Sequence, residues 1–123
     1  MSAIPYADDI LDSSVSMLQL VDVAKQLDLP ITRVHQLIRD RQILAVRRDS
    51  VPSVPEAFFG GDGRIVRGLP GLIAVMHDGG YRDEEILEWM FREDDSLPGG
   101  SAIAAMHTQS AREVVRRAQA LAF

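Results

Sequence analysis

The stretch LVDVAKQLDLPITRVHQLIRDRQILAVRR, residues Leu20–Arg48, decides the fold that we expect for this chain. Its apolar residues recur at helical spacing from Val21 to about Leu27, and a turn at Asp28 follows. Pro30 suits the first position of a second helix, because the N–H that proline lacks would have no partner there. The pattern predicts two short helices joined by a tight turn.

A short apolar run comes after the second helix. The run Ile43–Val46 is partly β-branched, which predicts a strand, and it ends in Arg47 and Arg48. The return strand, Val51–Val54, contains a proline that cannot donate to a β-ladder, so we expect it to be a short edge strand. Two helices followed by a basic ribbon predict a winged helix-turn-helix over residues 18–59.

Charge is distributed unevenly along the chain. The formal net charge is −5, yet residues 29–48 hold five arginines and one acid, whereas residues 49–111 hold four arginines and eleven acids. A local basic surface attracts anionic ligands even when the whole chain is acidic. The basic part coincides with the predicted winged helix-turn-helix.

The side chains expected on the outer face of the second helix suit DNA. Arginine pairs with guanine, glutamine pairs with adenine, and threonine contacts a phosphate or a methyl group. An ordinary amphipathic helix is the alternative, and the basic ribbon that follows favours DNA. We expect a helix at about 30–40 in the major groove and a wing at 43–54 on the backbone or in the minor groove. The predicted DNA-contact residues are Lys25, Thr32, Arg33, His35, Gln36, Arg39, Arg41, Arg47 and Arg48.

The chain from residue 60 to residue 123 reads as helical. Helices are expected at 70–77, from 83 to 91, at about 101–106 and from 110 onward. The segment from 83 to 91 has too many apolar residues for one narrow stripe, so it is either buried on several sides or offers a surface to a partner. The candidate partner surface is Trp89, Met90 and Phe91, with plain core packing as the alternative.

These patterns together predict a mainly α fold. It consists of a winged helix-turn-helix with a short β-ribbon wing, and of a C-terminal helical bundle packed against it. Residues 1–17 mix small, acidic and serine residues, which predicts a flexible tail. Within this tail Ser13 and Ser14 are candidate phosphate acceptors, with a solvated leader as the alternative.

Composition bears on several classes of function. The chain has no cysteine, which excludes disulfides and thiolate metal sites. Its three histidines lie far apart, so we expect no metal, no cofactor and no catalysis. No apolar run approaches the roughly 20 residues that span a bilayer, and the N-terminus lacks the basic region of a signal peptide. We expect a cytoplasmic, nucleoid-associated protein.

Two stretches carry resemblances to known families. The segment VDVAKQLDLPITRVHQLIRDRQILAVRR is similar to the helix-turn-helix of MerR-like and excisionase-like winged proteins. The second half, with LPGLIAVMHDGGYRDEEILEWMF and REVVRRAQ, resembles the toxin-binding domain of Xre/ParS-type antitoxins. Together, over about residues 18–123, they resemble a small actinobacterial family of winged helix-turn-helix DNA-binding proteins. The resemblance implies DNA binding through Arg33 and Gln36 on the recognition helix and through Arg47 and Arg48 on the wing.

Two functional hypotheses follow. The leading one is a transcriptional regulator that binds double-stranded DNA, with dimerisation through the helical second half presenting two half-sites. The other is an antitoxin-like interaction module whose C-terminal helices bind a partner protein. The two are compatible, because one chain can carry both surfaces.

Overall fold

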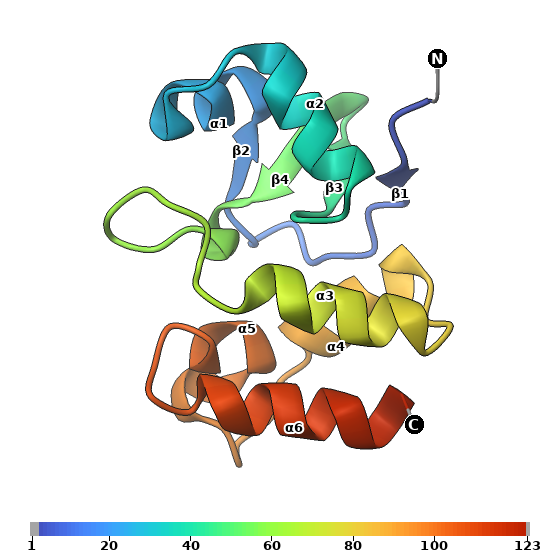
Figure 1. Cartoon of the computed structure of the whole chain (residues 1–123), viewed down its shortest axis with the longest axis vertical. Helices are drawn as coiled ribbons and strands as arrows, with labels where there is room; N and C mark the ends of the chain where they lie inside the picture. The colour runs from blue at the N-terminus through green and yellow to red at the C-terminus, as the bar shows by residue number, and fades with distance from the viewer. Residues whose placement is uncertain (1–2, 123) are drawn as a thin grey trace.

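The predicted helix pair is present as α1 (Leu20–Leu27) and α2 (Ile31–Arg39) in the computed structural model of the chain (Figure 1). Val23 and Val34 are fully buried, and the two helices pack against each other. Asp28 joins them with a φ of 55°, in the left-handed region that aspartate tolerates better than most residues. Both helices and the turn are confirmed.

A four-stranded sheet in the order β1-β3-β4-β2 accompanies the helix pair within residues 3–122, the part of the chain that the structure describes. The wing is the antiparallel hairpin of β3 (Ala45–Arg48) and β4 (Val51–Pro55). Both residues of its two-residue tip have positive φ, as a type I′ turn requires. The sequence placed the first strand of the wing two residues too early.

The prediction that the return strand is an edge strand was wrong. β2 (Met17–Gln19) pairs antiparallel with β4 on the side opposite β3, so β4 lies inside the sheet. The proline is tolerated because β2 pairs only with residues 53–55 of β4. Pro52 pairs with Arg47 of β3 but lies beyond the end of β2, so on the β2 side its missing N–H interrupts no ladder.

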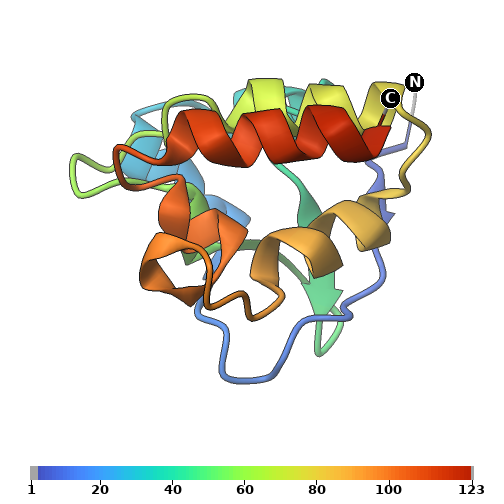
Figure 2. The same cartoon turned by 90° about the horizontal axis from the view of Figure 1, so that it is seen from below.

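The N-terminal segment also differs from the flexible tail that the sequence predicts. Residues 6 and 7 form β1 (Tyr6–Ala7), which pairs in parallel with β3, and Ala7 is buried. The segment then passes the wing and reaches β2, as Figure 2 shows from below. Residues 1 and 2 of the predicted tail lie outside the described residues.

The second half is helical, as predicted. A 3-10 turn, η1 (Glu56–Phe58), and a loop lead into it, and α3 lies between the winged half and α6 (Figures 1 and 2). The elements that follow η1 are α3 (Leu69–Asp78), α4 (Asp83–Phe91), the 3-10 turn η2 (Pro98–Gly100), α5 (Ala102–Ala105) and α6 (Ala111–Ala122).

The two halves share one hydrophobic core. Buried apolar residues from both form a continuous cluster, in which the rings of Phe58 and Phe91 lie 6.2 Å apart between centroids. A polar contact also joins the halves, since the guanidinium of Arg41 donates to the carboxylate of Asp83 at 3.0 Å. The orientation of the winged half is therefore fixed by packing against the helices.

The close approach of α3 and α6 gives a test of this packing. A Cβ added to Gly79 would stand 2.5 Å from the Cβ of Ala122 and 2.9 Å from its Cα. We expect Gly79→Ala to lower the free energy of unfolding by about 1–3 kcal/mol, measured by urea denaturation. Gly71→Ala is the matched control, because its Cβ would meet nothing within 4 Å. It should raise stability by about 0.4–1 kcal/mol, and equal losses in both variants would contradict the packing.

Candidate nucleic-acid interface

The outer face of α2 presents a row of polar side chains. Val34 and Ile38 turn inward and are buried, which leaves Thr32, Arg33 and Gln36 exposed on the opposite side. At nine residues the helix is about 13.5 Å long, comparable to the width of the major groove of B-DNA, about 12 Å. The predicted recognition helix has the exposure and the size that base contacts require.

Gln36 is oriented by a neighbouring carboxylate, and the other predicted contact residues of α1 and α2 differ in their exposed fraction. The amide nitrogen of Gln36 donates to the carboxylate of Asp40 at 2.9 Å, which orients the Gln36 side chain along the helix. His35 and Arg39 are half-buried at the sides of α2. Lys25 is exposed in the last turn of α1, next to the turn between the helices.

Arg47 is the exposed cation of the wing. Its guanidinium carbon lies 4.8 Å from the centroid of the Tyr6 ring, in a cation–π arrangement. The ring belongs to β1, which pairs with β3, so the contact restricts Arg47 while leaving it accessible. A preoriented arginine at this place suits a phosphate group.

Arg48 does not lie on the surface that the sequence assigned to it. Its Nε donates to Oδ2 of Asp9 at 2.8 Å, and its side chain is 18% exposed. Its terminal nitrogens donate to the carbonyl oxygens of Leu11 (3.3 Å), Asp12 (2.9 Å) and Val15 (2.7 Å). The guanidinium is thus surrounded by the N-terminal segment, and the structure does not support its predicted role as a DNA contact.

The lowered pKa of Asp9 shows that Arg48 stabilises the ionised form of this carboxyl group. The pKa of Asp9 is held below its ordinary value, chiefly by the hydrogen bond from the Arg48 guanidinium and also by the main-chain N–H of Leu11. Burial opposes this shift but does not outweigh it. Asp9 therefore stays ionised at neutral pH and keeps Arg48 paired.

Arg41 is likewise used inside the molecule. Its Nε and one terminal nitrogen donate to the two carboxylate oxygens of Asp83 at 3.0 and 3.4 Å. The Asp83 side chain is 11% exposed and that of Arg41 31%. Arg41 thus connects the end of α2 to the start of α4, and the structure does not support its predicted role as a DNA contact.

The candidate phosphate acceptors are exposed, and one of them is engaged locally. The Ser14 hydroxyl donates to the carboxylate of Asp12 at 2.7 Å, and the Ser14 N–H donates to the same oxygen at 2.8 Å. The Ser13 carbonyl accepts a weak hydrogen bond from Arg48 at 3.5 Å. Phosphorylation of either serine stays a prediction.

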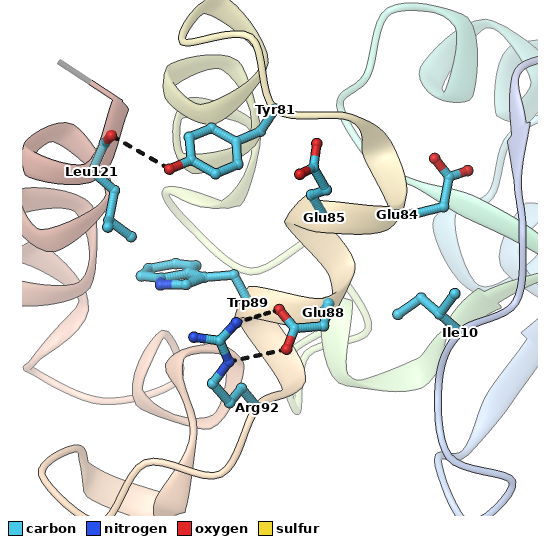
Figure 3. Close-up of a pocket in the computed structure, with 8 residues that line it drawn as sticks. All are labelled: Ile10, Tyr81, Glu84, Glu85, Glu88, Trp89, Arg92 and Leu121. Carbon is cyan, nitrogen blue, oxygen red and sulfur yellow. Dashed lines mark hydrogen bonds and ion pairs between the residues drawn. The ribbon is translucent and has the colours of Figure 1, made fainter.

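The predicted partner surface divides into three different environments. Met90 is fully buried in the core, so its assignment to a surface was wrong. Phe91 is half-buried and packs against Phe58, as the alternative of core packing requires. Trp89 is half-buried and lines a surface groove (Figure 3).

Sequence reasoning missed two kinds of residue near the interface. Tyr6 was placed in a flexible tail, although it lies under Arg47. Ile31 at the start of α2 is 37% exposed, and Val51 at the start of β4 is 38% exposed. Both are exposed apolar side chains next to predicted contact residues, Ile31 beside Thr32 and Val51 at the end of the wing hairpin. For Ile31 the sequence did hold a signal, since a large apolar residue stands directly before the predicted contacts Thr32 and Arg33.

The described residues contain neither a metal site nor a membrane-spanning helix. Residues 3–122 hold no group of three or more His, Asp or Glu side chains with the arrangement of a metal site. None of the helices in this range combines the length and the apolar character needed to cross a membrane.

Comparisons with known proteins match two parts of the chain to family models. Residues 3–59 match the family model described as "DNA-binding protein Rv2175c, wHTH domain", and residues 66–122 match "Rv2175c C-terminal domain of unknown function". DNA-binding protein Rv2175c of Mycobacterium tuberculosis (strain ATCC 25618 / H37Rv) is 40% identical over 134 residues, covering 100% of this chain and 92% of that protein. The NMR structure of Rv2175c superposes with a TM-score of 0.88 at 41% identity, covering 99% of this chain and 91% of that one.

These findings bear differently on the two resemblances. The likeness to an actinobacterial winged helix-turn-helix family is confirmed, since the matching relative is mycobacterial and its model covers the wing and both helices. The match to the second half describes a domain of unknown function. The resemblance of that half to antitoxin toxin-binding domains therefore stays a prediction.

The internal role of Arg48 can be tested through stability. We expect Arg48→Gln to lower the free energy of unfolding by about 2 kcal/mol at pH 7, because several charge-assisted hydrogen bonds are lost. The lowered pKa of Asp9 means that this contribution is complete above about pH 4 and is lost as the pH falls through the folded-state pKa. The difference between wild type and variant should therefore shrink in acid, measured by urea denaturation at several pH values.

Arg47→Gln is the control for this experiment, since it removes the same charge from the neighbouring, exposed position. It should cost less than about 1 kcal/mol, the size of an exposed cation–π contact. An Arg48→Gln variant as stable as Arg47→Gln would contradict the role assigned to Arg48.

Proposed function

The chain belongs to the family of the mycobacterial DNA-binding protein Rv2175c, and from this premise we propose that it binds double-stranded DNA as a transcriptional regulator. The observation that carries the proposal is the exposed polar face of α2, formed by Thr32, Arg33 and Gln36, beside a wing that presents Arg47. α2 would enter the major groove, and the wing would follow the backbone or the minor groove. The site of action would be the nucleoid in the cytoplasm.

The contacts assigned to phosphates are fewer than the sequence suggested. Arg41 and Arg48 have carboxylate partners within the molecule, and separating either pair to contact DNA would leave a partly buried carboxylate without its cation. The exposed cations that we assign to DNA are therefore Lys25, Arg33 and Arg47. Arg39, which is half-buried, stays a predicted contact. Each neutralised phosphate contributes about −0.9 to the slope of log K against log salt, so three give a slope of about −2.7.

A single copy of such a surface contacts few base pairs. Sequence-specific binders with one short recognition helix raise their affinity by presenting two half-sites one helical turn apart. We propose that this protein does the same as a symmetric homodimer. A pseudo-palindromic operator would be the signature of that arrangement, because operator symmetry mirrors protein symmetry.

The proposed interface predicts how charge removal changes DNA binding. Arg33→Gln and Arg47→Gln should each weaken binding to duplex DNA and reduce the salt slope by about 0.9, measured by fluorescence anisotropy at several salt concentrations. Arg112→Gln removes the same charge from an exposed position on α6 and should leave both quantities unchanged. If Arg47→Glu bound DNA as the wild type does, the wing would not belong to the interface.

Specificity is tested by selecting bound sequences from random duplex DNA at low and at high salt. We expect a defined motif to be enriched, and more strongly at high salt, because base contacts survive screening better than phosphate contacts do. Gln36→Ala should relax the preference at one position of the motif, where glutamine would read adenine. Selection that yields no motif at either salt concentration would contradict the role of a specific regulator.

A further inference from the structure

A groove beside the helical half is lined by none of the residues assigned to DNA. It has a volume of about 390 Å³ and runs between α4, the end of α6 and the N-terminal segment (Figure 3). Four residues with large apolar surfaces line it, namely Ile10, Tyr81, Trp89 and Leu121. Its volume falls in the range that accepts one or two large side chains.

The apolar surface of this groove is unusually exposed. Ile10 is 46% exposed and Leu121 51%, although both are large aliphatic side chains. The Tyr81 hydroxyl donates to the carbonyl oxygen of Leu121 at 3.4 Å and joins the start of α4 to the end of α6 (Figure 3). In Figure 3 the Trp89 side chain extends from α4 toward the segment of α6 that carries Leu121. Exposed apolar surface built on three ordered segments is typical of a docking site.

Carboxylates along α4 determine which partner this surface accepts. Glu84, Glu85 and Glu88 line the groove, against a single guanidinium, that of Arg92. Arg92 donates to both oxygens of Glu88 at 3.0 and 2.6 Å, and Arg82 contacts Glu85 at 3.3 Å. Both pairs are exposed to solvent and therefore weak, so an incoming cation can replace them at little cost. Glu84 accepts the N–H of Asp8 at 3.0 Å.

This combination of charge and shape excludes several occupants. DNA and anionic lipid surfaces are repelled by the carboxylates. A second copy docked groove to groove around a two-fold axis would bring six glutamates together, which is also unfavourable. A protein segment with a cation beside an apolar side chain is complementary to this surface, because it can contact both the carboxylates and the aromatic rings of Tyr81 and Trp89.

We propose that this groove docks a basic segment of a partner protein, with an arginine or lysine next to a large aliphatic residue. The aliphatic side chain would fill the space between Trp89 and Leu121. The cation would lie among the carboxylates of Glu84 and Glu88 and could stack on the indole, the ring most favourable for cation–π contacts. A tryptophan in a partly enclosed pocket is also the residue type that most often dominates binding energy at interfaces.

The chain carries its own reporter for this test, because Trp89 is its single tryptophan. The probe is a hexapeptide of alternating leucine and arginine. One matched peptide has glutamate in place of arginine, and another has serine in place of leucine. We expect a saturable change in tryptophan emission with the leucine–arginine peptide and at least tenfold weaker binding of both matched peptides.

Substitutions in the protein locate the effect. The double variant Glu84→Gln/Glu88→Gln should weaken binding of the leucine–arginine peptide about five- to tenfold, while Glu56→Gln/Asp95→Asn should bind as the wild type does. The control removes the same charge from exposed positions outside the groove. Circular dichroism of both variants checks that they are folded, and NMR shifts of the Ile10 and Leu121 methyl groups should follow the same titration.

Three results would overturn the proposal. These are equal binding by the two double variants, equal binding of the three peptides, or no saturable binding of any of them. Sedimentation of the protein alone tests whether a second copy of the chain occupies the groove instead. Self-association that the Glu84→Gln/Glu88→Gln variant abolishes would assign the groove to a second copy and would also reject the partner proposed here. Loss of DNA binding in other variants would leave this result untouched, because the two surfaces share no residue.

Discussion

The guanidinium of Arg48 is the contact on which the arrangement of the N-terminal segment depends. It bonds to the Asp9 carboxylate and to successive main-chain carbonyls, so one side chain holds residues 9–15 against the wing. Carbonyl groups in an irregular segment need donors, and arginine offers five in one plane. With residues 9–15 held in this way, β1 lies beside β3 and Tyr6 comes under Arg47.

The same contact shows why a count of basic residues overestimates a DNA-binding surface. Arg48 and Arg41 both lie in the basic stretch, yet each satisfies an acid from a distant part of the chain. An arginine whose carboxylate partner lies at 2.8–3.0 Å in a partly buried site stabilises the fold. Moving such an arginine outward to DNA would leave the carboxylate partly buried without a cation. Arg33 on α2 and Arg47 on the wing are exposed, so these two arginines are placed to meet an anionic ligand.

Local sequence signals predicted the parts of the fold that depend on local physics. Apolar periodicity located α1 and α2, and aspartate at position 28 was compatible with the left-handed turn that the structure contains. β1 was missed because a strand of two residues, paired in parallel with β3 nearly forty residues away, leaves no periodic pattern. The internal place of β4 was missed for a related reason, since nothing near Pro52 indicates that β2 pairs with only part of that strand.

The site followed the same rule. Exposure of Thr32, Arg33 and Gln36 follows from helical phase and was predictable, whereas the pairing of Arg41 with Asp83 depends on how two halves of the chain pack. Residues 89–91 show that sequence alone does not predict the environment of single side chains. These three consecutive apolar residues on one helix lie in a groove, in the core and in an aromatic contact. Sequence identified that α4 was too apolar for one stripe, and only the neighbours of each side chain decide which of them reaches solvent.

The N-terminal segment connects the two surfaces described above. Tyr6 lies under the exposed arginine of the wing, the N–H of Asp8 donates to Glu84, and Ile10 forms part of the groove wall. Between these contacts and β2 the segment has little regular structure, so its position rests on the carbonyls and the carboxylate that Arg48 binds. A change that weakens this one guanidinium contact therefore alters the support of Arg47 on one side and the groove beside α4 on the other, although the two surfaces have no residue in common.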